Sequence, residues 1–177
     1  MKREFLGDSY DAVKRMWREM LADWAPLYAE PRFFPDEQLR RDFAKLTGIP
    51  MLADNRPATY SILNDPDTGI RLPSETNQTE GRTHIAIPTI VDQLRMQAVR
   101  CVITFDQSNY RNADLGKEEQ RRAKMQCLVQ KGFHCFYYVS HAPFLFAAPD
   151  PDMLDELRKL LISAGIPDRD DRFQNPQ

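Results

Sequence analysis

The stretch at residues 60–70, YSILNDPDTGI, decides how this sequence is interpreted, because an apolar segment stops abruptly at two carboxylates. Its first half is rich in aromatic and branched residues that are typical of a buried β-strand. Residues 65–69, DPDTG, cannot continue a strand, since proline lacks a backbone donor and glycine lacks a side chain to pack. Ligands of open α/β sheets bind at the carboxyl ends of the strands. The stretch therefore predicts a strand over residues 60–64 and a polar site at the edge of the sheet.

Other segments carry strand signals of different strength. Residues 100–105, RCVITF, form the clearest buried strand, because apolar residues dominate them, and Asp106 follows directly. Residues 133–139 and 144–148 have the spacing of a hairpin. Short extended pieces are expected at residues 5–6, 26–28 and 84–87. A second carboxylate, Asp106, is thus expected at a neighbouring strand end, where it would share one crevice with Asp65.

Five segments are expected to be helical, and most of them have a residue that suits a helix end. In the first segment, apolar residues recur at steps of three and four, and the side-chain oxygen of Asp8 or Ser9 can cap the helix. Pro35 and Gly48 suit the first position and the left-handed end of the second segment. The expected helices are residues 8–23, 35–47, 88–97, 117–131 and 151–164. Polar loops are expected at residues 73–81 and 109–116.

The order of these elements predicts the fold class α/β, as a three-layer, Rossmann-like open sheet of about five to seven strands. We expect the sheet to be mostly parallel, with a C-terminal antiparallel strand pair and helix. The chain has 177 residues, of which 42% are hydrophobic. This length suits one domain with a sizeable core and is too short for two. We assign residues 1–167 to a single domain and residues 168–177 to a frayed C-terminal tail.

The composition bears on partners and on the cellular compartment. A net charge of −2 leaves no global basic field for nucleic acid. Only a local basic face in the second helix, formed by Arg40, Arg41 and Lys45, could contact phosphates, and such faces are usually just solvated. Three cysteines without a CxxC pair favour reduced thiols. The sequence has no apolar run of about 18 residues, so we expect a cytoplasmic protein without a membrane partner.

The acidic residues at the strand ends support one chemical interpretation. Asp65, Asp67 and Asp106, together with Asp8, could hold Mg²⁺, because hard cations prefer carboxylate oxygens. Such a site would make the protein a Mg²⁺-dependent phosphoesterase or nuclease. Asp, Pro, Thr and Gly are also ordinary turn formers, so that a turn without a ligand is the competing interpretation of residues 65–69.

The chain also resembles a known family in the order of its elements. A Gly7-Asp8 pair precedes an amphipathic helix, one strand ends in Asp65-Pro66-Asp67-Thr68-Gly69, another ends in Asp106-Gln107, and a strand pair precedes the last helix. This succession is similar to bacterial proteins related to N6-adenine-type methyltransferases. In that superfamily, an Asp-Pro-Pro-Tyr motif accepts the target amine and stacks an aromatic ring on the base. Asp65 and Pro66 match its first half, whereas Asp67 and Thr68 replace its second half.

The resemblance implies a methyltransferase-like protein of unassigned substrate, either active or degenerate, with S-adenosylmethionine as its cofactor. It places Asp65 and Asp106 near the reacting end, and Gly7, Asp8 and Asp11 near the adenosyl group. The sequence contains no G-x-G turn of the kind that normally lets a backbone approach this cofactor. A non-catalytic interaction module is therefore a further alternative. Helix capping is the competing role for both Asp8 and Asp11.

His141 completes the candidate catalytic residues, which also include Asp65, Asp67 and Asp106. It lies in the sequence SHAP between the last two expected strands. An imidazole exchanges protons near neutral pH, so His141 could act as a general base or proton shuttle. Exposure at the tip of a hairpin is the competing interpretation. The other histidines and the cysteines lack the spacing of zinc ligands.

Overall fold

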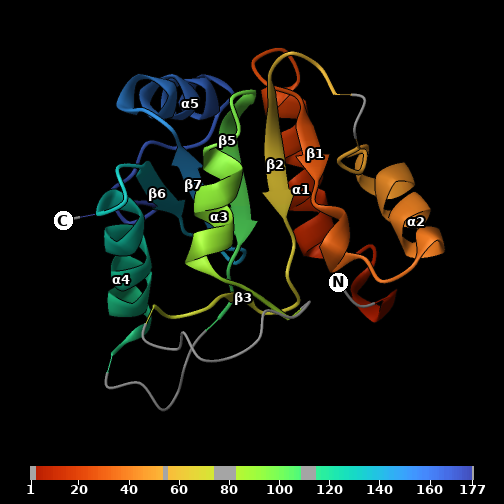
Figure 1. Ribbon diagram of the computed structural model, residues 1–177, viewed down its shortest axis with the longest axis horizontal. Helices are drawn as coiled ribbons and strands as arrows, with labels where there is room; N and C mark the ends of the chain where they lie inside the picture. The colour runs from red at the N-terminus through yellow and green to blue at the C-terminus, as the bar shows by residue number, and fades with distance from the viewer. Residues whose placement is uncertain (1–2, 54–55, 74–82, 109–114, 177) are drawn as a thin grey trace.

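The computed structural model describes residues 3–53, 56–73, 83–108 and 115–176. Its main sheet contains six strands in the order β1-β2-β5-β7-β6-β8, and a separate two-stranded sheet contains β3 and β4 (Figure 1). The strands are β1 (Leu27–Ala29), β2 (Tyr60–Asn64), β3 (Gly69–Ile70), β4 (His84–Ile85), β5 (Val99–Phe105), β6 (His134–Tyr138), β7 (Phe144–Ala148) and β8 (Phe173–Gln174). The α-helices are α1 (Ser9–Leu21), α2 (Glu37–Thr47), α3 (Ile87–Leu94), α4 (Lys117–Val129) and α5 (Pro151–Ser163).

The main sheet is mixed. Strands β1, β2 and β5 pair in parallel, whereas β7 is antiparallel to both β5 and β6, and β8 is antiparallel to β6. Strand β6 therefore runs in the same direction as β1, β2 and β5. The carboxyl ends of four strands consequently meet at one edge of the sheet, which we call the carboxyl edge. The α/β class is confirmed, as is the antiparallel pairing of the two strands expected near residues 133–139 and 144–148.

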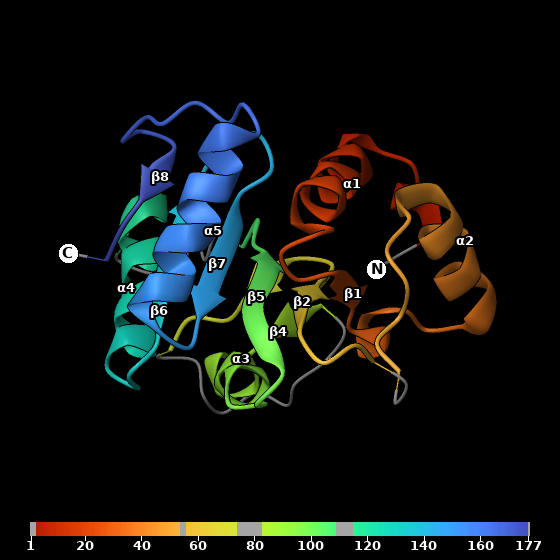
Figure 2. The same cartoon turned by 90° about the horizontal axis from the view of Figure 1, so that it is seen from above.

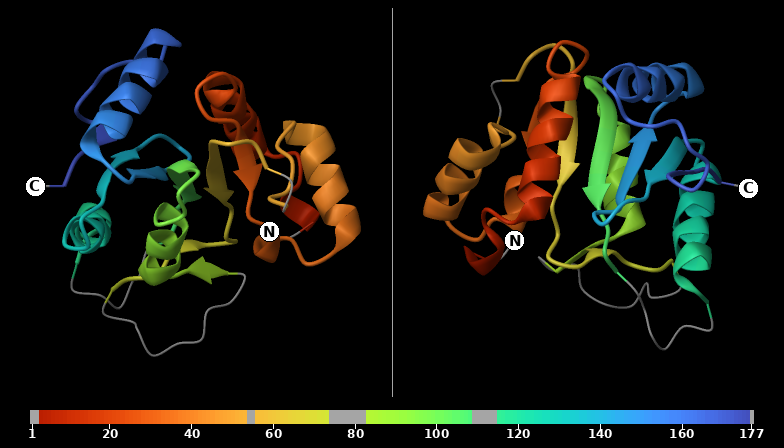
Figure 3. Two further views of the ribbon diagram at one scale, coloured as in Figure 1. Left: turned by 45° about the horizontal axis from the view of Figure 1, so that its top comes forward. Right: turned by 180° about the vertical axis from the view of Figure 1, so that it is seen from behind.

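Helices cover both faces of this sheet (Figure 2). Helices α1 and α5 lie on one face, where α1 packs on β1 and α5 packs on β5, β6 and β7. Helices α3 and α4 lie on the other face, over β5 and β6 respectively. Helix α2 packs against α1 beyond the β1 side of the sheet (Figure 3). Within the described residues, no helix combines the length and the apolar character needed to cross a membrane.

Trp17 anchors α1 to the sheet. Its fully buried ring meets Tyr138, Phe144 and Phe146 edge-on, at centroid distances of 5.4, 6.0 and 5.2 Å. Edge-to-face contacts of this kind stabilise a core beyond the area that they bury. The apolar residues at three and four residue steps in α1 thus place one face of the helix on the aromatic centre of the sheet.

Most helix ends follow from the sequence. Asp8 caps α1, where its side chain accepts hydrogen bonds from the backbone N–H groups of Tyr10 and Asp11. Gly48 ends α2 with a positive φ of 73°. Pro35 does not start α2, because the side chain of Asp36 accepts the bond that caps this helix, which begins at Glu37.

Several short segments differ from expectation. Residues 3–5 form a 3₁₀ turn, Arg3–Phe5, where an extended piece was expected at residues 5–6. The frayed C-terminal tail is wrong, since β8 pairs with β6 and Phe173 is buried against the rings of Phe136 and Tyr138. The sequence did not predict that β3 and β4 pair with each other in a separate sheet. Residues 74–81 and 109–114 of the two expected polar loops lie outside the described residues.

We expect Trp17→Ala to lower the free energy of unfolding by about 3–5 kcal/mol, because a large, fully buried ring leaves a cavity among three aromatic neighbours. Urea unfolding followed by circular dichroism measures this loss. The matched control is Trp24→Ala, which removes a partly buried ring that packs on Arg100 and donates to Glu156. That variant should lose about 1 kcal/mol. Equal losses in the two variants would contradict the anchoring role of Trp17.

Candidate functional site

Asp65 and Asp106 follow neighbouring parallel strands but point to opposite faces of the sheet, so the expectation that they share one crevice is wrong. In the register of β2 and β5, Asn64 lies opposite Thr104, and the Asn64 amide donates to the Thr104 hydroxyl at 3.2 Å. Asp65 comes one residue after Asn64, whereas Asp106 comes two residues after Thr104. Successive side chains of a strand alternate between the two faces. Asp65 therefore points toward α1, and Asp106 points toward α4, as the partners of each carboxylate confirm.

The first cluster, which we call the Lys14 cluster, joins Asp65 to α1. The Lys14 ammonium donates to Asp65 at 2.8 Å and to Asp11 at 2.9 Å, and both oxygens of Asp65 lie within salt-bridge distance of it. The second oxygen of Asp11 accepts a bond from the backbone of Gly7 at 2.8 Å. No member of the ion triplet is more than 3% exposed. Helix α1 is thereby fixed to the carboxyl end of β2.

The Lys14 cluster contains two carboxylates and one ammonium, so its charges do not cancel. Burial lowers the pKa of Lys14, but the carboxylates of Asp65 and Asp11 outweigh burial and raise this pKa above its ordinary value. Burial also raises the pKa of Asp65, and the attraction of Lys14 counteracts this only in part. The pKa of Lys14 rises because of its two carboxylate neighbours, whereas the pKa of Asp65 rises mainly because of burial.

The second cluster, which we call the Asp106 cluster, lies on the opposite face. One carboxylate oxygen of Asp106 accepts from the Lys124 ammonium and from the Tyr137 hydroxyl, each at 2.7 Å. The other oxygen accepts from the backbone N–H of Ile70 at 2.9 Å, and from both the backbone and the hydroxyl of Ser108. Lys124 also donates to the Ser108 hydroxyl at 2.7 Å. The bonds fill the acceptor capacity of the carboxylate, so Asp106 is committed to holding the structure together.

Burial sets the protonation of the donors around Asp106. Burial lowers the pKa of Lys124, and the adjacent Asp106 carboxylate only partly restores it. Burial, followed by the charge of Asp106, raises the pKa of Tyr137 well above its ordinary value. Tyr137 therefore stays a neutral donor to Asp106 under ordinary conditions.

Gly69 brings the loop after β2 into contact with this cluster. Its φ is 139°, and a Cβ atom at this position would overlap Asp106 Oδ1 and lie 2.8 Å from Asp106 Cα. The backbone of Gln107 donates to the carbonyl of Thr68 at 3.0 Å. The loops that follow β2 and β5 therefore stack directly on each other, which requires glycine at this position.

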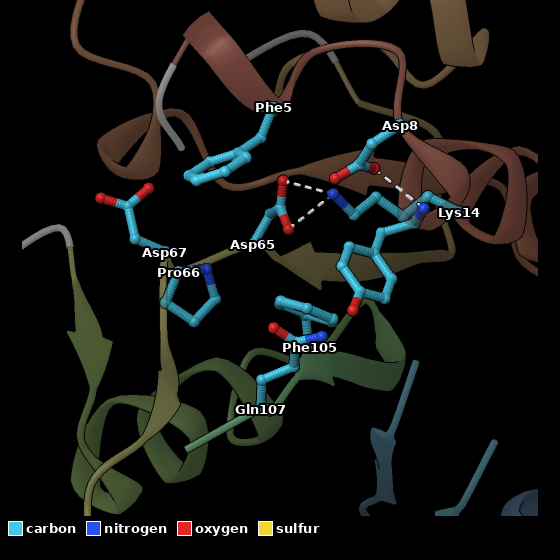
Figure 4. Close-up of a pocket in the computed structure, with 9 residues that line it drawn as sticks. Phe5, Asp8, Lys14, Asp65, Pro66, Asp67, Phe105 and Gln107 are labelled. Atoms are coloured by element: carbon cyan, nitrogen blue, oxygen red, sulfur yellow. Dashed lines mark hydrogen bonds and ion pairs between the residues drawn. The ribbon is translucent and has the colours of Figure 1, made fainter. Parts of the chain in front are cut away.

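Two hollows flank the stacked loops. The first, which we call the aromatic cavity, has a volume of about 100 Å³ and lies on the α1 side (Figure 4). Its lining comprises Phe5, Asp8, Tyr10, Lys14, Asp65, Pro66, Asp67, Phe105 and Gln107. In Figure 4 the Asp65 carboxylate lies between the rings of Phe5 and Phe105. The cavity thus combines aromatic walls with carboxylates.

The second hollow, which we call the basic groove, has a volume of about 450 Å³ and lies between the end of β5, the start of α4 and the β6–β7 turn. Its lining comprises Asp106, Gln107, Ser108, Lys117, Arg121, Val139, Ser140, His141 and Pro143. Gln107 lines both hollows. The rings of Tyr10 and His141 stack at a centroid distance of 5.7 Å, so the aromatic cavity and the basic groove are neighbours.

The structure brings only some of the candidate residues together. Asp65 and Asp67 line the aromatic cavity with Asp8, while Asp106 and exposed His141 line the basic groove. Gly7 lies just before α1, where its backbone N–H donates to Asp11, and Asp11 lies in the first turn of α1 with a buried contact to Lys14. Among the described residues, no three His, Cys, Asp or Glu side chains gather in a way that could hold a metal ion. Asp65 and Asp106 each contact a lysine ammonium instead.

Sequence reasoning missed the buried lysines and their partners. Lys14 has a signal in the sequence, because it lies on the same helical face as Tyr10, Trp17 and Leu21, where a lysine requires a carboxylate partner. Lys124 lies on the same face of α4 as Leu128. A lysine in an apolar stripe was thus a signal for the Lys14 cluster, whereas most neighbours of Lys124 on its helical face are polar and gave no such signal.

The comparisons with known proteins add no relative. No protein-family model matches this chain, and no curated protein or solved structure shows a significant match to it.

We expect Gly69→Ala to destabilise the protein by at least about 2 kcal/mol, since it combines backbone strain with overlap on the Asp106 loop. The matched control is Gly132→Ala, where φ is also positive, at 86°, but nothing lies within 4 Å of an added Cβ. That variant should lose about 1 kcal/mol from backbone strain alone. Thermal and urea unfolding compare the two, and a Gly69→Ala loss no larger than that of the control would contradict the close approach of the loops.

The raised pKa of Lys14 predicts a pH dependence with a definite sign. Above the ordinary lysine value of 10.5, the unfolded chain releases the Lys14 proton while the folded chain retains it. The contribution of this ammonium is therefore complete below that pH and is lost as the pH rises through the folded-state value. The stability of the wild type over Lys14→Met should therefore shrink as the pH rises above about 10.5. Urea unfolding over this range tests it, and a constant difference would refute the raised pKa.

Proposed function

We propose that the aromatic cavity binds an amine-bearing planar base of the adenine type, in a methyltransferase-like domain that is catalytically degenerate. The observation that carries this proposal is the Asp65 carboxylate, which lies in a cavity with three aromatic rings, those of Phe5, Tyr10 and Phe105. Four strands that end at one edge, with helices on both faces, support a Rossmann-like arrangement for such a site.

The aromatic walls suit a planar ring. Tyr10 and Phe105 pack with a centroid distance of 5.2 Å, and Phe5 remains 48% exposed at the mouth of the cavity. Stacking of a base on an aromatic side chain contributes about 1–3 kcal/mol. In the resembling family, the aromatic residue of the motif supplies this stacking, and here the three rings supply it in place of Thr68.

The charges in the cavity suit an amine donor. Asp65 accepts from Lys14, and its two oxygens keep further lone pairs for an amine, since a carboxylate has about four acceptor sites. Asp8 and Asp67 add two more carboxylates to the lining, against the single ammonium of Lys14. Negative charge that exceeds positive charge favours a ligand that donates hydrogen bonds.

The residues that the resemblance assigns to S-adenosylmethionine do not fit that cofactor. Asp8 and Asp11 already accept bonds from the backbone around the start of α1, and Asp11 is buried against Lys14. The cavity of about 100 Å³ is smaller than the roughly 300–1,000 Å³ of sites that enclose a whole ligand. The cavity suits one ring system, and we derive no methyl-transfer step from it.

The metal-dependent interpretation has weaker support. Ammonium groups lie within 2.8 Å of Asp65 and within 2.7 Å of Asp106, at positions where a cation would otherwise neutralise these carboxylates. The two carboxylates also point to opposite faces of the sheet. A two-metal phosphoesterase needs its carboxylates around one shared pair of ions.

We expect adenosine to bind and Phe5→Ala to weaken that binding by about 1–3 kcal/mol, because the variant removes a stacking wall. Isothermal titration calorimetry measures the affinity. Phe5 lies in a 3₁₀ turn and is half exposed, so the variant should keep its fold. Val129→Ala, which removes an equally exposed apolar side chain at the end of α4, is the control and should leave the affinity unchanged.

A second comparison tests the role of Asp65 without changing the protein. Inosine carries a carbonyl where adenosine carries an amine, and a carboxylate repels a carbonyl oxygen. Adenosine should therefore bind more tightly than inosine by tenfold or more, that is by about 1.4 kcal/mol. Equal affinity for both nucleosides, or binding that ignores Phe5, would refute the proposed function.

A further inference from the structure

The basic groove carries positive charge that the described part of the chain does not neutralise. Lys117 and Arg121 both line it, and neither forms an ion pair with any described residue. Arg121 donates through Nε to the amide oxygen of Gln174 at 2.8 Å, which orients the guanidinium. The remaining N–H groups of Arg121 are available to a ligand.

Asp106 is the only carboxylate among the described residues that line the groove, and it is already neutralised. Asp106 accepts bonds from Lys124, Tyr137 and Ser108, as well as from the backbone of Ile70. Lys124 is fully buried, so its charge is compensated inside the protein and does not add to the groove. Lys117 and Arg121 therefore leave the groove with a net positive charge.

The geometry of the groove matches an anion with several oxygens. Lys117 and Arg121 are four residues apart on the same face of α4, at the end where helix dipoles favour negative charge. Gln107, after β5, brings a side-chain amide from the facing side, whereas the Ser140 hydroxyl at the β6–β7 turn already donates to the carbonyl of Ala142 at 3.2 Å. Arginine and lysine with neutral donors around them are the usual partners of a phosphate group.

The groove and the aromatic cavity meet at shared residues. Gln107 lines both, and the Tyr10 ring of the cavity stacks on the His141 ring of the groove with an interplanar angle of 17°. A ligand that crosses this boundary would contact aromatic rings and Asp65 at one end, and Lys117 and Arg121 at the other end.

We propose that the basic groove is a phosphate-binding site, and that it binds the phosphate of a mononucleotide whose base enters the aromatic cavity. The first part depends only on the groove. The second part rests on the proposed function, and it names the ligand class as a purine nucleoside monophosphate with an amine on its base.

Titration calorimetry with three probes, adenosine, inorganic phosphate and adenosine 5′-monophosphate, separates these parts. The monophosphate should bind at least about tenfold more tightly than adenosine at low salt, because charge-assisted bonds to phosphate are added. Arg121→Gln should remove this advantage and the binding of inorganic phosphate, while adenosine affinity stays unchanged. The advantage should also fall as the salt concentration rises.

Arg122→Gln is the matched control. Arg122 is the next residue of α4, but it pairs with Glu118 and lines a different hollow. This variant should bind all three probes like the wild type, and circular dichroism should show that both variants are folded.

The outcomes distinguish the two proposals. Absence of inorganic phosphate binding, or phosphate binding that Arg121→Gln leaves intact, would overturn the phosphate site. Arg121-dependent binding of phosphate without any binding of adenosine would support the site and refute the base-binding function. Independent binding of adenosine and phosphate without a gain for the monophosphate would refute the single ligand that spans both hollows.

Discussion

The Asp106 carboxylate joins four parts of the chain that are remote in sequence, namely the end of β5, strand β3, helix α4 and strand β6. A buried carboxylate is unfavourable unless hydrogen bonds and an opposite charge compensate for the lost water. Lys124 supplies that charge, and it is itself stable in the core only because Asp106 is there. The arrangement of the carboxyl edge on this face depends on the pair, since removal of either partner would leave an uncompensated buried charge. The close approach of Gly69 then places the loop after β2 against the same carboxylate.

The Lys14 cluster has a different role on the other face. It contains more negative than positive charge, and one of its carboxylates, Asp65, lines the aromatic cavity. The Asp106 cluster uses all acceptor sites of its carboxylate, whereas the Lys14 cluster keeps acceptor capacity for a donor. Two lysine–carboxylate clusters at adjacent strand ends thus differ in their chemistry, with one closed and one open to a ligand.

The sequence predicts the regular elements well because local physics determines them. Apolar runs gave β2, β5 and the β6–β7 pair, and periodic apolar residues with capping residues gave the helices. It missed β8, since two residues within a charged segment have no pattern of their own and become a strand only by pairing with β6. It also missed both clusters, because the partner of Lys14 lies 51 residues away and that of Lys124 lies 18 residues away. Such partners become apparent only when the strand register is known.

The difference of one residue between the strand ends determines what the carboxyl edge can bind. If Asp65 and Asp106 lay on the same face, they would repel each other unless a proton or a cation were shared between them. The register places Asn64 opposite Thr104, so the first carboxylate after β2 and the first after β5 lie on different faces, and each contacts a lysine from a different helix layer. This separation produces two adjacent hollows of unlike charge, a carboxylate-rich cavity on the α1 side and a groove with basic side chains on the α4 side. A ligand that suits this arrangement has a hydrogen-bond donor at one end, which faces the carboxylates, and an anion at the other end, which faces the basic side chains.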